Sequence, residues 1–211
     1  LFSLGEKLEI FFRLDNLGRI FIVIVTIIWI LAGFYSFEYM KHEKEEKRYF
    51  GFYLMTFGVL LALDLAGNIV TYYLFYEMMT LLSVPLVLHS KTREALMGGL
   101  KYLFYSLCGA YMVLMGLFFL NRYATTLTFT AGGTLNGELT AGNEKVLLVV
   151  VFFMILGFGV KAGMFPMHAW LPTAHPVAPA PASSVLSGLI VKAGVLGVIR
   201  TVYFLFGESF I

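Results

Sequence analysis

The stretch IFIVIVTIIWILAGFYSF occupies residues 20–37 and contains no charged side chain. As a helix, these 18 residues would extend roughly 27 Å, which approaches the thickness of the hydrocarbon core of a bilayer. The run is too long for the apolar part of a signal peptide, and a charged segment follows it rather than a small-residue cleavage site. The sequence therefore predicts a transmembrane helix at this position.

The composition of the whole chain extends this interpretation. Of its 211 residues, 59% are hydrophobic and only 13% are charged, whereas about 25% of the residues of a typical soluble domain are charged. The net charge of +2 is too small to indicate nucleic acid as a partner. A single cysteine, Cys108, excludes a disulfide framework within the chain. We expect a membrane protein whose main surrounding is the lipid bilayer.

Five more apolar stretches bring the number of predicted spans to six. The six spans cover residues 20–37, 49–64, 68–88, 99–121, 146–166 with a broken continuation to 171, and 183–206. Helices satisfy their own backbone hydrogen bonds in lipid, so the predicted fold is an all-α membrane protein with one membrane domain over residues 1–211. The loops 38–48, 89–101 and 171–182 carry seven basic residues against five on the opposite side. The positive-inside rule therefore places the 38–48 and 89–101 loops in the cytoplasm and the chain in the cell membrane as a multi-pass protein.

Two connections between the spans contain residues that are typical of tight turns. Asp64 and the Gly67-Asn68 pair predict a tight turn between the second and third spans. The polar segment 122–144 contains Asn136-Gly137, a pair typical of a two-residue hairpin turn. We expect this segment to form a small surface hairpin outside the cytoplasm.

Three ionisable residues lie well inside predicted spans: Glu77, Lys161 and Lys192. Each costs about 2.5–3.5 kcal/mol at the bilayer centre, so we expect them to face the protein interior, one another or enclosed water. A passive salt bridge between Glu77 and Lys161 is one interpretation, but buried ion pairs rarely improve on apolar packing. Function is therefore the favoured interpretation. Arg200, near the end of the last span, is expected to extend to the lipid headgroups.

The fifth span contains features of a proton relay. Burial and a nearby opposite charge act in opposite directions on the proton affinity of a buried group, so a changing distance between partners would move a proton. Pro166 and Pro172 deprive the carbonyls of Ala162 and His168 of their helical donors. His168 follows Lys161 by seven residues, two turns on along the same face and about 10 Å away in an unbroken helix. Its imidazole suits either a relay or an ordinary buried position, and both interpretations stay open.

Cofactor chemistry has no counterpart among these residues. The four histidines, at 42, 89, 168 and 175, form no zinc motif. Gly157, Gly159 and Gly163 lack the spacing and the preceding strand of a dinucleotide fingerprint. We expect neither a cofactor nor a metal site, and no catalytic site of the chain's own.

Three segments resemble one known family. They are LFYEMMTLLSVPLVLHS (74–90), GFGVKAGMFPMHAWLPTAHPVAPAP (157–181) and SGLIVKAGVLGVIR (187–200). They are similar to the proton-translocating, antiporter-like membrane subunits of respiratory complex I, membrane-bound hydrogenases, formate hydrogenlyase and multisubunit Na+/H+ antiporters. The lysine before FPMHAWLP, with a second lysine about thirty residues on, is the specific part of the pattern.

The resemblance implies a role for each buried charge. Glu77 and Lys161 would form the family's switching pair, Lys192 would be its connecting lysine, and His168 would occupy a relay position. The six spans would correspond to the family's third to eighth helices, of which the last five form one inverted-topology unit. The chain would then be a fragment that lacks the second unit and its exit path.

Several functions remain open at this stage. The leading one is proton translocation as a subunit of a redox-driven complex, such as a hydrogenase or an NADH dehydrogenase, assembled with other membrane subunits. A subunit of a Na+/H+ antiporter would use the same residues with a cation site added. A structural membrane scaffold, in which the buried charges only align the helices, belongs to a different class. A stand-alone enzyme is the weakest alternative.

Overall fold

The computed structural model describes residues 2–3 and 8–211. Five helices in it are long and apolar enough to cross a membrane: α1 (Asn16–Met40), α3 (Ile69–Val87), α4 (Arg93–Tyr123), α6 (Glu144–Ala162) and a continuous helix over Ala180–Phe206. The last consists of α8 (Ala180–Val185), η1 (Leu186–Ile190), α9 (Val191–Ile199) and η2 (Arg200–Phe206), where η marks wider, π-helical turns. The all-α membrane fold is confirmed.

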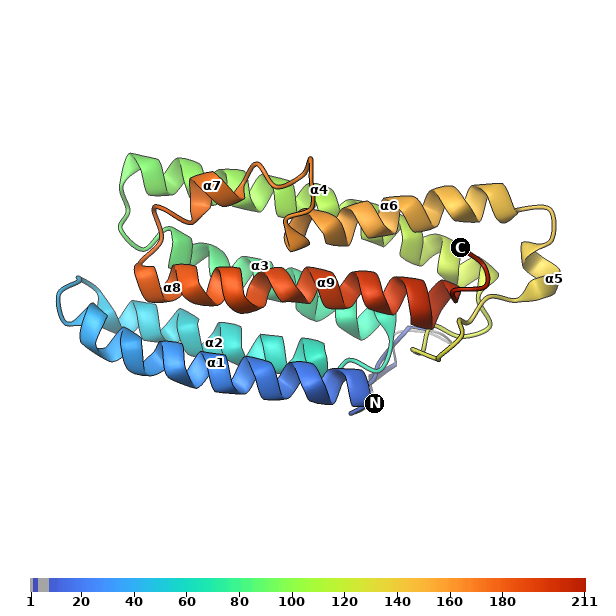
Figure 1. Cartoon of the computed structure of the whole chain (residues 1–211), viewed down its shortest axis with the longest axis horizontal. Coiled ribbons are helices and arrows are strands. Elements are labelled where there is room, and N and C mark those ends of the chain that lie inside the picture. The colour runs from blue at the N-terminus through green and yellow to red at the C-terminus, as the bar shows by residue number, and fades with distance from the viewer. Residues whose placement is uncertain (1, 4–7) are drawn as a thin grey trace.

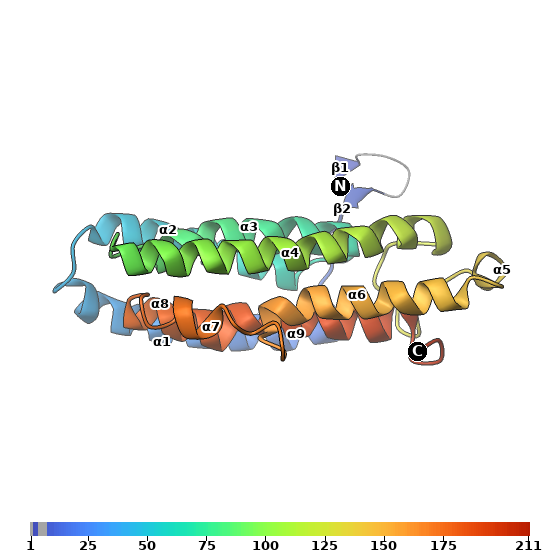
Figure 2. The same cartoon turned by 90° about the horizontal axis from the view of Figure 1, so that it is seen from above.

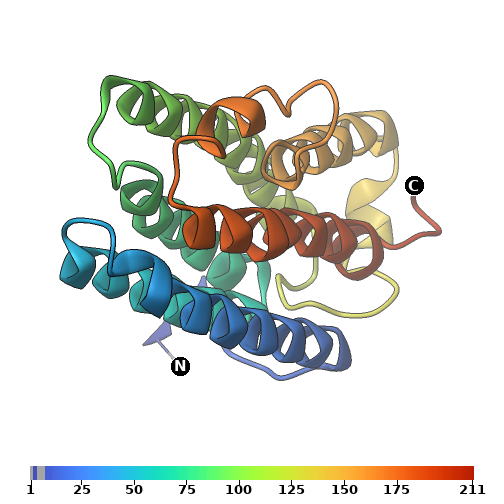
Figure 3. The same cartoon turned by 60° about the vertical axis from the view of Figure 1, so that its left-hand side comes forward.

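The second predicted span corresponds to α2 (Glu46–Asp64), whose 19 residues include charged residues at both ends. It runs beside α1 and α3 along the length of the bundle, so the chain traverses the bundle six times (Figure 1). Both termini consequently lie toward the same end of the bundle (Figure 1). The oblique view shows the N-terminus beside α1 and α2 and the C-terminus just beyond the 180–206 helix (Figure 3). Two short helices, α5 (Gly137–Thr140) and α7 (Leu171–Ala174), lie in the connections.

The helices form two layers. One contains α2, α3 and α4, and the other contains α1, α6, α7 and the 180–206 helix (Figure 2). The layers meet chiefly where α4 packs on α6, while α3 joins α2 to α4 within its own layer. A minimal antiparallel pair, β1 (Phe2–Ser3) and β2 (Glu9–Ile10), lies outside the bundle.

Side-chain caps fix where several helices begin. Asp15 Oδ1 accepts from the backbone N–H of Gly18, and Asn68 Oδ1 accepts from that of Thr71. Such caps satisfy N–H groups that the first helical turn leaves without partners. Asn68 starts α3 four residues after α2 ends, which confirms the predicted turn.

The fifth span breaks earlier than the prolines predicted. α6 ends at Ala162 because Gly163 adopts a left-handed conformation with φ +73°, a conformation that glycine adopts without a steric penalty. The expected continuation of the helix to residue 166 is therefore wrong. The chain turns irregularly as far as α7, so α6 stops near the middle of the bundle (Figure 1).

The polar segment 122–144 does not form the expected hairpin turn. Asn136 caps α5 instead, because its Oδ1 accepts from the N–H groups of Glu138 and Leu139. Ala124 and Leu135 form an isolated antiparallel bridge, and Thr134 N donates to Leu205 O at 2.8 Å. The segment is held against the end of η2 and covers one end of the bundle.

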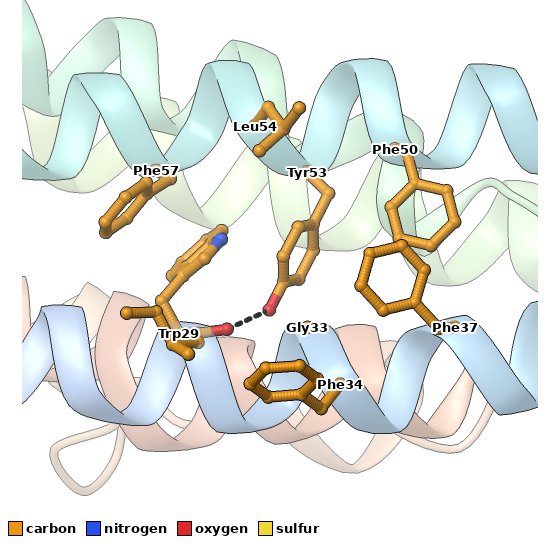
Figure 4. A pocket seen from close by; sticks show the side chains of 9 residues that line it. Trp29, Gly33, Phe34, Phe37, Phe50, Tyr53, Leu54 and Phe57 are labelled. Carbon is orange, nitrogen blue, oxygen red and sulfur yellow. Dashed lines mark hydrogen bonds between the residues drawn. The ribbon is translucent and has the colours of Figure 1, made fainter.

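The outward faces of the helices are apolar, as a lipid-facing surface requires. Phe34, Phe37 and Leu54 are all more than half exposed. Aromatic rings of α1 and α2 line a shallow apolar groove at this surface, shown in Figure 4. Tyr53 closes its floor by donating a 2.7 Å hydrogen bond to the carbonyl of Trp29.

Candidate functional site: a buried lysine at the break in α6

Lys161 is completely buried, and three hydroxyl groups surround its ammonium. Its Nζ donates to Thr80 Oγ1 at 2.8 Å, to Ser106 Oγ at 2.9 Å and to the Tyr102 hydroxyl at 3.0 Å. Nζ also lies 4.4 Å from the centroid of the Tyr102 ring, within cation–π range. Because an ammonium has three N–H donors, this shell uses all of them.

The packing of α4 on α6 brings these groups together. A Cβ on Gly109 would lie 2.6 Å from Gly157 O, and a Cβ on Gly157 would lie 2.4 Å from Gly109 O. The two backbones therefore touch at a point where only glycine fits. Lys161 lies one turn beyond Gly157, and Ser106 lies one turn before Gly109. The close crossing places the lysine directly against the hydroxyl face of α4.

The shell extends to a second layer of hydroxyl groups. Tyr102 OH and Ser83 Oγ lie 2.7 Å apart, and either can be the donor. Thr80 Oγ1 also donates to the carbonyl of Tyr76. Hydroxyl groups both donate and accept, so this shell suits Lys161 as an ammonium and, after reorientation, as a neutral amine. Fixed carbonyls would suit only the ammonium.

Glu77 lies near this shell but does not pair with it directly. It precedes Thr80 by three residues on α3, which puts both side chains on the same face. The charge of Lys161 acts on Glu77, yet no ion pair joins them in the part of the chain that the structure describes. Glu77 Oε1 is buried without a hydrogen-bond partner.

A tryptophan satisfies the backbone at the break in α6. Trp170 is fully buried, and its Nε1 donates to Val160 O at 2.8 Å. Its ring lies 4.8 Å from that of Tyr102, so the same side chain supports the lysine shell. Pro172 has no N–H to donate to the carbonyl of His168. This carbonyl accepts instead from Leu171 N at 3.0 Å in a tight turn. Protein groups therefore satisfy the carbonyls of Val160 and His168.

His168 and Lys192 are not part of this cluster. The break at Gly163 removes His168 from the helix of Lys161, so the expected alignment two turns along one face is wrong. His168 is partly buried beside the ring of Phe165, and its Nδ1 has no partner. Lys192 is exposed on the outward side of α9, so the expectation that it faces the interior of this chain is wrong. Its neighbours Ala193 and Gly194 take the buried face.

Arg200 also differs from expectation. It is 1% exposed rather than extended toward the headgroups. Both of its terminal nitrogens donate to the carboxylate of Asp15, and its guanidinium lies 4.6 Å from the ring centroid of Phe129. The sequence placed Arg200 near a helix end correctly but gave no sign of its partner, 185 residues away.

The hydroxyl shell was the part of the site that sequence reasoning missed. Tyr102 and Ser106 are spaced four residues apart within a span, and this spacing puts both hydroxyls on one helix face. That spacing was the available signal. Within the described residues, no group of three or more His, Cys, Asp or Glu side chains could hold a metal ion.

Comparison with known proteins defines the class of this helical membrane protein. Residues 66–210 match the family described as NADH:quinone oxidoreductase/Mrp antiporter, transmembrane, and residues 2–50 match the N-terminal family of complex I chain 5. The first match covers more than half of the chain. This chain belongs to the antiporter-like membrane subunits of the NADH:quinone oxidoreductase/Mrp family.

Its relatives come from hydrogenase and antiporter systems. Hydrogenase-4 component B of Escherichia coli is 30% identical over 206 residues, which cover 97% of this chain and 30% of that protein. A Na(+)/H(+) antiporter subunit of Alkalihalophilus pseudofirmus is 23% identical over 195 residues, 92% of this chain and 39% of that protein. The chain thus spans about a third of the length of these relatives.

Two solved complexes contain similar structures. A chain of the membrane-bound sulfane sulfur reductase, an archaeal respiratory membrane complex, superposes with a TM-score of 0.73 at 27% identity, covering 90% of this chain and 30% of that one. A chain of the Mrp complex from Dietzia gives a TM-score of 0.77 at 18% identity, covering 90% of this chain and 35% of that one. The second similarity concerns the fold alone.

Proposed function

We propose that this chain translocates protons across the membrane, with Glu77 and Lys161 as a coupled pair, inside a larger redox-driven complex. The observation that carries the proposal is the shell of three hydroxyls around a fully buried lysine. A lysine that only aligned helices would need a fixed counter-ion to offset its desolvation. A shell of groups that can donate or accept supports both protonation states instead.

The proton would reach Lys161 through groups that change partners. Glu77 is partly buried and within reach of the lysine's charge, and its Oε1 lacks a fixed partner. A shift of the ammonium toward Glu77 would favour the charged state of both groups, and a shift back into the hydroxyl shell would favour release. His168 and Lys192 are proposed as later relays, which requires that other parts of the complex cover the exposed face of Lys192.

A second candidate function is Na+/H+ antiport with the same pair. Relatives named as Na(+)/H(+) antiporter subunits support it as well as the hydrogenase relatives support the first. The two functions differ in the ion that is exchanged, so uptake of radioactive sodium into vesicles separates them. Under either function we propose that the chain crosses the cell membrane as an inverted-topology unit and assembles with other membrane subunits.

The deciding experiment replaces Lys161 by Ala in the full-length protein within its native complex. We expect proton translocation to fall at least tenfold while the complex assembles normally. Lys145→Ala, at an exposed position near the start of α6, is the matched control and should leave transport unchanged. Normal translocation by an assembled Lys161→Ala complex would favour the scaffold function and overturn the proposal.

A further inference from the structure

A second buried charged cluster lies at the end of the bundle where both termini lie. We call it the Arg200 cluster, and it consists of Asp15, Asp64 and Arg200. Asp15 precedes α1, Asp64 ends α2 and Arg200 begins η2. A Cβ on Gly18 would lie 2.4 Å from Asp64 O, which shows how closely the start of α1 lies against the end of α2.

The single guanidinium in this cluster is already paired. Both terminal nitrogens of Arg200 donate to Asp15, with Nη2 to Oδ1 at 2.8 Å. This two-point pairing is the strongest geometry between arginine and a carboxylate. The two nitrogens also hold the pKa of Asp15 below its usual range, against the opposing effect of burial. Asp15 is thus the ionised partner of Arg200.

Asp64, in contrast, has no partner for either of its oxygens. The residue is 1% exposed, and both Oδ1 and Oδ2 are buried without a hydrogen bond. Arg200 Nε is also buried without a partner, and the charge of Arg200 acts on Asp64. An ionised carboxylate in this setting would be desolvated and uncompensated, which is strongly unfavourable. A protonated carboxyl group carries no such charge.

Among the residues that the structure describes, the elements packed around Asp64 provide no counter-ion besides Arg200. From α3, Tyr72 faces it, and its hydroxyl donates to the carbonyl of Ala193. From the segment before α1, Arg13 donates its backbone N–H to Leu65 O and its guanidinium to Phe129 O, so it is engaged elsewhere. Arg200, from η2, is therefore the cation available to Asp64, and it is shared with Asp15.

We propose that Asp64 is a proton-binding site at this end of the bundle and exchanges its proton against a hydrogen bond from Arg200. In the bound state the proton is on one carboxyl oxygen of Asp64 and Arg200 pairs with Asp15 alone. On release, the proton passes to water, and the carboxylate accepts the free N–H of Arg200 Nε. Since Asp15 caps α1, Asp64 ends α2 and Arg200 begins η2, release would draw the ends of these elements together.

This site is separate from the Lys161 shell, so its test does not depend on transport. The protonated carboxyl of Asp64 should give a carbonyl band in the infrared spectrum of the full-length protein in its complex, and the band should vanish as pH is raised. Asp64→Asn should abolish the band, whereas Asp64→Glu should retain one. Glu138→Gln, at an exposed carboxylate of the same end, is the control and should leave it unchanged.

The exchange with Arg200 has its own test. Asp15→Asn removes the competing carboxylate, so Arg200 becomes free to pair with Asp64 and the band should disappear at lower pH than in the unaltered protein. If the spectra of the unaltered protein and the Asp64→Asn variant contained the same carbonyl bands, the proposal would be overturned. A band that titrates identically with and without Asp15 would overturn the exchange.

Discussion

A charged side chain in the middle of a bundle is tolerable in two different ways. An ion pair neutralises it permanently, whereas a shell of neutral hydroxyls satisfies its hydrogen bonds and leaves its charge free to vary. Lys161 follows the second course, since Thr80, Tyr102 and Ser106 provide one oxygen each. The Asp15–Arg200 pair follows the first. The same chain therefore contains a buried cation paired with a carboxylate, Arg200, and a buried cation surrounded by hydroxyl groups, Lys161.

The hydroxyl of Tyr102 should matter more than its ring. Tyr102→Phe removes one acceptor from Lys161 and one partner from Ser83, so we expect a loss of about 1–3 kcal/mol in stability. Translocation should also fall, because the shell can no longer reorient around the lysine. Melting temperature and transport of the full-length complex measure the two effects.

Tyr111→Phe is the matched control for this change. Tyr111 lies on the same helix but is 65% exposed, so its hydroxyl has nothing buried to satisfy. If Tyr111→Phe lowered the melting temperature and the transport rate as much as Tyr102→Phe does, the role of the hydroxyl shell would be contradicted.

Trp170 should stabilise the break in α6 through its indole N–H. Trp170→Phe leaves the carbonyl of Val160 without this donor, and we expect a cost of about 1–3 kcal/mol from the lost hydrogen bond. Trp29→Phe is a suitable comparison, because Trp29 is also buried but its Nε1 has no hydrogen-bond partner. The unfolding temperature should fall more in the Trp170→Phe variant than in the Trp29→Phe variant. The reverse order would contradict the role assigned to the indole N–H of Trp170.

Buried charges are visible in a sequence, but their partners are not. Lys161 and Glu77 are conspicuous within apolar runs, whereas Tyr102 is one of many aromatic residues and its contact with Lys161 crosses 59 residues. Lys192 illustrates the same limit, because hydropathy indicates that a lysine is inside the bilayer but does not say which way it points. The direction depends on how α9 packs, and Ala193 and Gly194 take the inner face.

At the scale of elements, the contact between α4 and α6 determines the geometry of the site. Gly157→Ala would place a Cβ 2.4 Å from the carbonyl of Gly109. A backbone carbonyl cannot move aside as a flexible side chain can. We therefore expect the two helices to separate, which lowers the stability of the fold by about 1–3 kcal/mol. Transport should fall with stability, because the shell of Lys161 opens.

Gly58→Ala on α2 is the control for Gly157→Ala, because it changes the helix propensity in the same way without a steric clash. Nothing lies within 4 Å of the added Cβ there, and alanine favours a helix over glycine by about 1 kcal/mol. We expect this variant to be as stable as the unaltered chain or more so. If Gly157→Ala behaved in the same way in a thermal unfolding assay, the close crossing would be disproved.

The pattern of apolar runs indicates where helices lie more closely than it indicates where they end. All six predicted spans have a helix at their position, with ends that differ by a few residues where caps such as Asp15 and Asn68 fix them. The break in α6 was expected at Pro166, but Gly163 causes it three residues earlier. Asn136-Gly137 suits both a hairpin and a helix cap, and in the structure Asn136 caps α5 while Thr134, two residues before it, bonds to Leu205 of η2.

At the scale of the whole molecule, the turn between α1 and α2 is joined to the end of α3 by a buried histidine. His89 is 6% exposed, and its Nε2 lies 2.9 Å from the carbonyl of Lys44. Burial lowers the pKa of His89 from its ordinary value of 6.5. A lowered pKa means that the unfolded chain binds the proton more readily, so acid favours unfolding.

We therefore expect stability to be full above about pH 6.5 and to decline as pH falls toward the lowered pKa of His89. His89→Gln should flatten this part of the stability profile, whereas His42→Gln, at an exposed position of the same turn, should not. Thermal unfolding measured across this pH range is the test. An unchanged acid decline in the His89→Gln variant would contradict the assignment.

The central claim is that Glu77 and Lys161 act as one coupled unit in proton transfer. Measuring translocation by the native complex with Glu77→Gln, Lys161→Ala and both changes together tests it most directly. We predict that each single change lowers the rate by at least tenfold and that the double variant is no slower than the slower single one. Rates that fall by the product of the two single effects would show that the residues act independently, and the claim would be wrong.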